Sequence, residues 1–244
     1  LAKLNTFNLK NRFSENDHLI VCISWTYGSG GVNIGFKLAD KLKINFYDAE
    51  IFEAVLKRLE AQKDSIQDSV SYGIKPGIKK EQAHDQNANV NPSEAFIPER
   101  HLTLRQRMRE FSRFHGLPKR DAVFFNESDL LVDMAKKEDF VILGRCGDAI
   151  MANNNIPHIS IYITAPFEQR IKRAMEIDSS LTVKQARHML KHLDHVHSQY
   201  YHYYTNRNWG HSNNYDLCIN SASYGIDGTV DFIYRMIMAR EEDK

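Results

Sequence analysis

A glycine-rich turn near the start of the chain is the first segment whose residue types and spacing suggest a specific chemistry. Residues 24–35 read SWTYGSGGVNIG, between an apolar run at 19–23 and a helical pattern that begins at Phe36. A strand, a glycine-rich turn and a helix in this order are typical of a phosphate-binding loop, because backbone N–H groups and the helix N-terminus both favour an anion. The candidate residues for this loop are Tyr27, Gly28, Ser29, Gly30, Gly31, Val32 and Asn33.

The loop lacks the side chains that usually accompany such a turn. The common signature GxxxxGK[ST] adds a lysine for the outer phosphates and a hydroxyl for magnesium. When the glycines are aligned, Gly31 occupies the lysine position and Asn33 lies at or near the hydroxyl position. The strict pattern therefore fails, and a plain strand-to-helix turn remains an alternative interpretation of this segment taken alone.

Arg145 is the first candidate for a phosphate contact outside the loop. It follows directly the apolar run at 140–144, where a strand is expected to end. A guanidinium group presents its donors in a planar fork that matches phosphate oxygens. The alternative is a surface arginine at the edge of the sheet.

Two aspartates also follow apolar segments. Asp48 closes the sequence NFYD, where it begins an acceptor-binding segment or orients an arginine, or else caps a helix that starts at Ala49, and the functional and capping interpretations have equal weight. Asp148 caps its own helix or helps to place a metal, and the cap is favoured.

Histidines, aromatic residues and one acid gather between about 188 and 209. Asp194 holds magnesium or orients an arginine, unless it is simply solvated. His188, His192 and His195 share a face of a helix and could bind a transition metal, but no cysteine or carboxylate pair completes a site, so no metal ligands are predicted. The aromatic residues of this region either stack on a base or pack the segment onto the core. They are Tyr200, Tyr201, Tyr203, Tyr204 and Trp209.

The elements that must position these residues can be predicted from apolar patterns. Strands are expected at 19–24, 140–144, 158–164 and 215–220, and helices at 31–43, 50–59, about 102–114, 166–175 and 226–240. Alternating strands and helices predict an α/β fold with a mainly parallel sheet covered on both faces. Ligands bind outside the carboxyl ends of such strands. The segments expected there are 24–31, 144–148 and 164–167.

The composition narrows the class of protein. The chain of 244 residues is 42% hydrophobic and carries a formal net charge of +1, which gives no overall field for nucleic acid or membrane partners. Neither a membrane-length apolar run nor a signal peptide is visible, so a cytoplasmic location is expected. Residues 61–100 are polar, and we interpret most of them as a mobile excursion from the core. The oligomeric state is not predicted.

Four ordered blocks resemble the cytidylate kinase-like proteins, a branch of the nucleoside monophosphate kinases. The block ISWTYGSGGVNIGFKLADKLKINFYD resembles their opening, in which a YGSGG turn replaces the lysine-bearing loop, and FVILGRCGDAI resembles the strand ending in Gly-Arg that contacts the acceptor nucleotide. The blocks ISIYITAPFEQRIKRA and LDHVHSQYYHYYTNRNWGHSNNYDLCIN resemble the unit leading into the lid and the return of the lid. Together the blocks span most of 19–240, whereas 61–118 is weakly matched.

The resemblance implies a P-loop nucleoside-triphosphate-hydrolase-like core with a nucleotide-acceptor insertion and a lid. After an N-terminal extension at 1–18, a single domain would span 19–240. Its core would comprise 19–49, 121–174 and 213–240, with the insertion at about 50–120 and the lid at about 175–212. The implied activity is transfer of the γ-phosphoryl group of ATP, with Mg²⁺, to a nucleoside monophosphate such as CMP.

The resemblance also assigns roles to residues. The catalytic residues would be Arg145, which holds the acceptor phosphate, and three arginines that neutralise the transferring group, Arg170, Arg173 and Arg207. The substrate-binding residues would be Asp48, Arg145, Asp194 and His197.

Two departures from the family pattern leave a second function open. Val32 and Asn33 stand where an arginine and a glutamate commonly follow GSGG, and His195 and His197 stand where a lysine and an arginine commonly follow the acid of the lid. One arginine can contribute about 10³–10⁵ in the rate of phosphoryl transfer, so the departures threaten catalysis more than binding. The alternative is therefore a catalytically impaired nucleotide-binding sensor or scaffold of the same fold.

Overall fold

A parallel five-stranded sheet organises the part of the chain that the structure describes. The computed structural model describes residues 9, 12–48 and 119–239. The strands are β1 (Ile20–Trp25), β2 (Asn45–Tyr47), β3 (Phe140–Leu143), β4 (Ile159–Thr164) and β5 (Leu217–Asn220). Their order in the sheet is β2-β3-β1-β4-β5, and every pair is parallel. The expected α/β fold with a parallel sheet is confirmed.

The chain divides into two compact units. One comprises Leu1–Asp48 and Ser128–Lys244, and the other comprises Ala49–Glu127. The helices of the described residues are α1 (Gly31–Leu42), α4 (Lys119–Ala135), α5 (Gly147–Asn153), α6 (Phe167–Ile177), α7 (Val183–Thr205) and α8 (Ser221–Met238), with a short 3₁₀ turn at Ser212–Asn214. None of these helices is long and apolar enough to cross a membrane.

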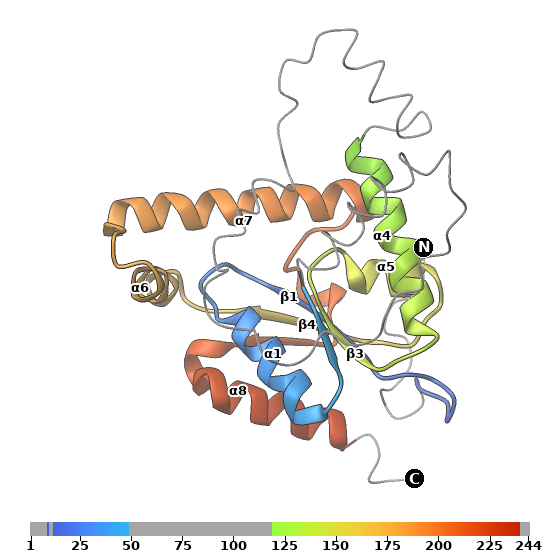
Figure 1. The fold of residues 1–244 in the computed structure, drawn as a ribbon. Coiled ribbons are helices and arrows are strands. Elements are labelled where there is room, and N and C mark those ends of the chain that lie inside the picture. Colours follow the sequence, from blue (N-terminus) through green and yellow to red (C-terminus); the bar gives the residue numbers. More distant parts are fainter. Residues whose placement is uncertain (1–8, 10–11, 49–118, 240–244) are drawn as a thin grey trace, which may run out of the picture. The chain divides into compact units, whose positions relative to one another are not determined.

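Both faces of the sheet are covered, which explains why its central strands read as continuous apolar runs. All residues of β1 are buried, and alternate side chains point to opposite faces. Val21 and Ile23 belong to the core under α1 and α8, whereas Cys22 lies toward Gly147 of α5. Figure 1 shows α1 and α8 together on one side of the sheet and α5 on the other.

The observed elements match most of the predicted ones. The four predicted strands are confirmed, and β2 was missed because its three residues lie at the edge of the sheet and none of them is buried. The last helix begins earlier than predicted, at Ser221, and contains a kink at Gly225. The helices expected at 50–59 and 102–114 lie outside the described residues.

Helices α6 and α7 pack against each other, and we call this pair of helices the arm. Thr182 starts α7 with a capping box, because its side chain accepts from the Gln185 backbone N–H while the Gln185 side chain accepts from the Thr182 backbone N–H. Apolar residues of both helices share a small core that includes Ile171 and Leu190. This arm presents Arg170 and Asp194 toward the glycine-rich turn.

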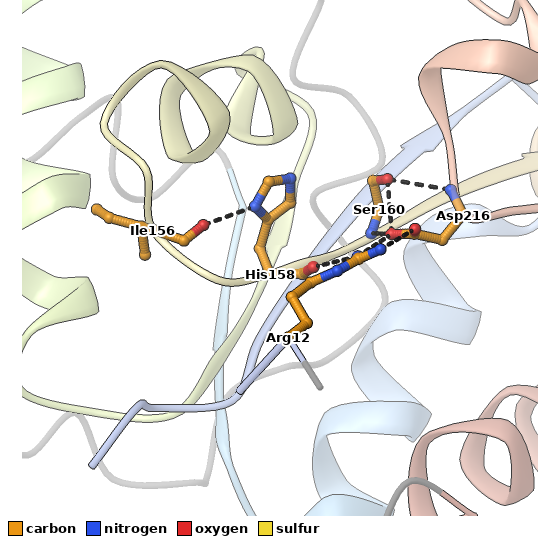
Figure 2. A network of polar contacts seen from close by, with 5 residues as sticks. All are labelled: Arg12, Ile156, His158, Ser160 and Asp216. Carbon is orange, nitrogen blue, oxygen red and sulfur yellow. Dashed lines mark hydrogen bonds and ion pairs between the residues drawn. The ribbon is translucent and has the colours of Figure 1, made fainter. Parts of the chain in front are cut away.

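At the amino end of the sheet, a buried ion pair fixes the segment that precedes β1. Arg12 contacts both carboxylate oxygens of Asp216, each at 2.8 Å, and it also donates to the backbone carbonyl of His158 at 2.8 Å. The same carboxylate accepts the backbone N–H and the hydroxyl of Ser160 (Figure 2). This amino-edge network joins residue 12 to the beginnings of β4 and β5.

Candidate functional site

The glycine-rich turn lies at the carboxyl end of β1, where a parallel sheet is expected to bind its ligand. Gly28 and Gly30 have φ of +77° and +81°, a region that residues with a Cβ rarely adopt. A Cβ on Gly28 would lie 2.7 Å from the backbone oxygen of Arg170, and one on Gly30 would lie 2.8 Å from Nη1 of Arg173. The glycines therefore allow α6 to pack directly against the turn.

Three successive carbonyl groups of the turn accept hydrogen bonds from side chains. The Tyr27 carbonyl accepts from Nε of Arg170 at 2.6 Å, and the Gly28 carbonyl accepts from Nη1 of Arg173 at 3.2 Å. The Ser29 carbonyl accepts from the buried hydroxyl of Ser221 at 2.5 Å. The oxygens of the turn are thus engaged by groups that come from α6 and the start of α8.

Unlike the carbonyls, most N–H groups of the same turn have no hydrogen-bond partner among the described residues. The Tyr27 N–H donates to Asp194, and the Ser29 N–H donates to the Thr26 carbonyl. The remaining N–H groups from the turn into the first turn of α1 donate no hydrogen bond to any residue that the structure describes. They belong to Gly28, Gly30, Gly31, Val32 and Asn33. These donors, together with the N-terminus of α1, can hold an anion.

Arg170 and Asp194 form a nearly buried ion pair beside the turn. Nη2 of Arg170 donates to Oδ2 of Asp194 at 2.5 Å, and Oδ1 of Asp194 accepts the Tyr27 N–H at 3.1 Å. Burial raises the pKa of Asp194, and the guanidinium of Arg170 and the Tyr27 N–H oppose that rise. Asp194 therefore orients an arginine, which was one of the roles considered from the sequence.

His197 lies in a cluster of aromatic rings next to the turn. Its ring centroid is 5.7 Å from Trp25, 5.2 Å from Tyr27 and 5.7 Å from Trp209. Burial, with a smaller contribution from the charge of Arg145, lowers the pKa of His197 to about 4. At neutral pH His197 is uncharged, so at that position it supplies no cation for a phosphate.

Arg145 lies at the carboxyl end of β3 in an unusual stretch of backbone. Gly144, Arg145 and Cys146 all have positive φ, and Arg145 and Cys146 are not glycine. Non-glycine residues in this region cost about 1–2 kcal/mol each, and such backbone often occurs at functional sites. Burial raises the pKa of Tyr27 and lowers that of His197, and the charge of Arg145 opposes the first shift and adds to the second, which places its guanidinium in the neighbourhood of the turn.

Arg207 follows the end of α7. Its Nη1 atom is buried and has no hydrogen-bond partner among the described residues. Its charge opposes the rise in the pKa of Asp148 that burial causes, and Asp148 accepts the hydroxyl of Tyr201 at 2.6 Å. Cys146, not Asp148, occupies the N-cap of α5, so the cap predicted for Asp148 was wrong.

The other candidates from the sequence are more dispersed. Asp48 follows β2 directly, and its charge adds to the rise in the pKa of Tyr27 that burial causes, so it too lies near the turn. Tyr204 makes edge-to-face contacts with Tyr200 and with Tyr203. His188, His192 and His195 are exposed on α7, and within the described ranges no three histidine, cysteine or acidic side chains are grouped as metal ligands.

Ser221 is the contribution that the sequence interpretation missed. Its hydroxyl lies 2.5 Å from the Ser29 carbonyl and 3.2 Å from the Thr164 carbonyl. Asn220 caps the following helix, by accepting the Ala222 N–H. The only sequence signal was its position directly after β5, at the same edge of the sheet as the turn.

Comparisons with known proteins give a family match and a fold match. The sequence model of the cytidylate kinase-like family matches residues 20–223. No curated protein matches the sequence. The structure of an uncharacterized protein from Eubacterium ventriosum ATCC 27560 covers 90% of this chain and 98% of its own, with 22% identity and a TM-score of 0.60, which supports the fold.

Two shikimate kinase structures are more distant. The enzyme from Acinetobacter baumannii, in complex with shikimate, covers 96% of this chain and 99% of its own, with 14% identity and a TM-score of 0.42. The enzyme from Aquifex aeolicus covers 92% of this chain and 100% of its own, with 16% identity and a TM-score of 0.38. At these TM-scores, neither likeness carries a conclusion about this chain.

Proposed function

Because this chain belongs to the cytidylate kinase-like family, we propose that it transfers the γ-phosphoryl group of ATP to a nucleoside monophosphate such as CMP. The observation that carries the proposal is the turn at the carboxyl end of β1. Its carbonyls at 27–29 are engaged by side chains, whereas the N–H groups of Gly28 and of 30–33 have no acceptor in the described structure. A triphosphate would supply the acceptor oxygens that these donors lack.

In this proposal the four arginines have separate roles. Arg145, at the end of β3, holds the acceptor phosphate. Arg207 and the free donors of Arg173 neutralise the charge that develops on the transferring group. Arg170 is committed to Tyr27 and Asp194, so it acts on the turn and not on the phosphoryl group.

Magnesium enters this proposal as part of the nucleotide complex. Both oxygens of Asp194 already accept hydrogen bonds, and no cluster of three acidic or histidine side chains occurs in the portion of the chain that the structure describes. The residues present therefore do not form a dedicated magnesium cage. Mg²⁺ is commonly held by substrate phosphates and water with few protein ligands.

A second candidate function is a nucleotide-binding sensor or scaffold that does not turn over. It is favoured by the absence of a charged side chain in the turn and by His197, whose pKa of about 4 leaves it neutral where the family commonly has a cation. The turn would then bind phosphate, and the arm of α6 and α7 would respond to the bound ligand.

Product analysis separates the two functions. The protein is incubated with ATP, Mg²⁺ and each of CMP, dCMP, UMP, AMP and GMP, and the nucleotides are separated by chromatography. Paired formation of ADP and a nucleoside diphosphate at about 1 s⁻¹ or faster supports the kinase, since this is the lower end of ordinary turnover. If no acceptor is phosphorylated by protein that still binds ATP, the kinase proposal is contradicted and the sensor is favoured.

Introducing a positive charge at position 32 also distinguishes a kinase from a binding protein. Val32 is 39% exposed in the first turn of α1, so Val32→Arg adds a guanidinium without burying it. A weak kinase should gain activity by more than tenfold, because an added cation stabilises transition-state charge. A pure binding protein should gain affinity for ATP and remain without turnover.

A further inference from the structure

We propose that Arg170 and Ser221 are positioning residues that make the turn a phosphate cradle of N–H donors, and that this arrangement takes the place of the missing lysine. The inference rests on the proposed function in one respect, that the turn holds phosphate. It concerns how the turn binds an anion and not whether a phosphoryl group is transferred.

Arg170 is fixed on both sides of its guanidinium. Nε donates to the Tyr27 carbonyl, Nη2 donates to Asp194, and the residue is only 5% exposed. Asp194 in turn accepts the Tyr27 N–H. The peptide groups on both sides of Tyr27 are therefore held by a single ion pair that links α6 to α7.

Arg173 and Ser221 hold the next two carbonyls. Arg173 donates to Gly28, and the hydroxyl of Ser221, which is fully buried, donates to Ser29. Because a peptide carbonyl and the following N–H belong to one planar group, fixing the carbonyl outward fixes the next N–H on the opposite side. The carbonyls of 27 and 29 belong to the same peptide groups as the N–H of Gly28 and Gly30, whereas the Gly28 carbonyl shares its group with the Ser29 N–H, which donates to the Thr26 carbonyl.

The electrostatic consequence favours an anion. A carbonyl oxygen turned toward a phosphate would repel it, whereas each carbonyl engaged by a guanidinium or hydroxyl is held away from it. Preorganised N–H donors in a partly buried site require no rearrangement when the charge arrives. The two guanidinium groups also bring positive charge to the turn from α6 without lying in the turn itself.

The decisive property of Arg170 is then its geometry and not its charge. Lysine keeps the charge but presents a single ammonium group, which cannot reproduce the planar fork that reaches Tyr27 and Asp194 together. If Arg170 acted only as a nearby positive charge, Arg170→Lys would leave the affinity for an anion almost unchanged. The variant therefore separates positioning from simple charge.

The test measures binding of inorganic pyrophosphate to the full chain by isothermal titration calorimetry. Arg170→Lys should raise the pyrophosphate Kd at least tenfold, and Ser221→Ala should raise it severalfold by releasing the Ser29 carbonyl. The matched control is Arg187→Lys, because Arg187 also makes an ion pair, with Glu168 at 2.8 Å, but lies on the exposed side of α7. The control should bind pyrophosphate within twofold of the parent.

A folded Arg170→Lys protein that binds pyrophosphate as tightly as the parent would overturn the inference. If that variant does not fold, Ser221→Ala decides, and unchanged affinity there would also overturn it. Pyrophosphate binding that depends on Arg170 in a parent without kinase activity would support the cradle and contradict the kinase. A parent that binds no pyrophosphate would contradict both proposals.

Discussion

Two largely buried arginine–aspartate pairs at opposite ends of the sheet make similar contacts and serve different purposes. At the amino end, Arg12 pairs with Asp216 and donates to a backbone carbonyl, while the carboxylate accepts a backbone N–H. At the carboxyl end, Arg170 pairs with Asp194 in the same way, with the Tyr27 carbonyl and N–H as the backbone partners. Figure 2 shows the first of these pairs.

The difference lies in what each pair leaves for a ligand. The amino-edge network ties residue 12 to β4 and β5, and the N–H groups it touches all donate within the protein. The carboxyl-edge pair fixes a turn whose following N–H groups have no acceptor among the described residues. The same type of ion pair therefore stabilises the fold at the amino edge and, in our account, prepares the turn for an anion at the carboxyl edge.

Removing Arg12 should have the largest effect on stability. Arg12→Met leaves the carboxylate of Asp216 buried without its cation, which costs about 3–5 kcal/mol in the free energy of unfolding. Urea unfolding measures this loss. Pyrophosphate affinity of the folded fraction should remain that of the parent, and a large loss of affinity would contradict the division between the two edges.

Gly28→Ala should distort the glycine-rich turn at the carboxyl edge of the sheet. The new Cβ would meet the backbone oxygen of Arg170 at 2.7 Å in a residue with φ of +77°. The strain costs about 1–3 kcal/mol of stability, and we expect the reoriented turn to lose at least tenfold in pyrophosphate affinity. Calorimetry and urea unfolding of the same preparation measure the two losses. Unchanged affinity would show that the backbone of the turn does not bind the anion.

His197 should make stability fall in mild acid. Its pKa is lowered from 6.5 to about 4, so the unfolded chain takes up a proton before the folded protein does. The stabilisation is complete above about pH 6.5 and is lost as the pH falls toward 4, by about 2 kcal/mol at pH 4.5.

Replacing the histidine tests this assignment. His197→Asn should shrink the difference in unfolding free energy between pH 7 and pH 4.5 by about that 2 kcal/mol, whereas His192→Asn, on the exposed face of α7, should leave it unchanged. An equal pH dependence in the parent and His197→Asn would contradict the assignment.

Lys37 should have the smallest effect. Its ammonium lies 2.6 Å from Asp227 on α8, and both side chains are at least half exposed. Lys37→Met should change the unfolding free energy by less than about 1 kcal/mol, and it should leave pyrophosphate affinity as in the parent. A loss of affinity in this variant would mean that a lysine of α1 serves the turn after all.

The fold was largely predictable because its central strands are apolar on both faces. The runs at β1, β3 and β4 stand out in the sequence, and the expected P-loop-type fold class is confirmed by the sheet and by the family. The strand β2 could not be predicted, since three partly exposed residues at an edge carry little pattern. The glycine turn was predicted from its order between a strand and a helix.

The partners of the turn could not be predicted from the sequence. Arg170 and Arg173 were predicted as cations for the phosphoryl group, but the sequence did not indicate that each of them donates to a carbonyl of the turn. Their contacts with Tyr27 and Gly28 depend on how α6 packs against the turn, 143 and 145 residues away in the chain. Ser221 was missed as a partner of the turn for the same reason.

The most direct test is to record amide NMR spectra of the full chain during titration with ATP and Mg²⁺. We predict that the amide signals of Gly28, Gly30, Gly31, Val32 and Asn33 move and that their hydrogen exchange slows, because these N–H groups gain phosphate acceptors. The Ser160 amide, which donates to Asp216 in the amino-edge network, should not move. Binding of ATP that leaves the signals of the turn unchanged would contradict the account.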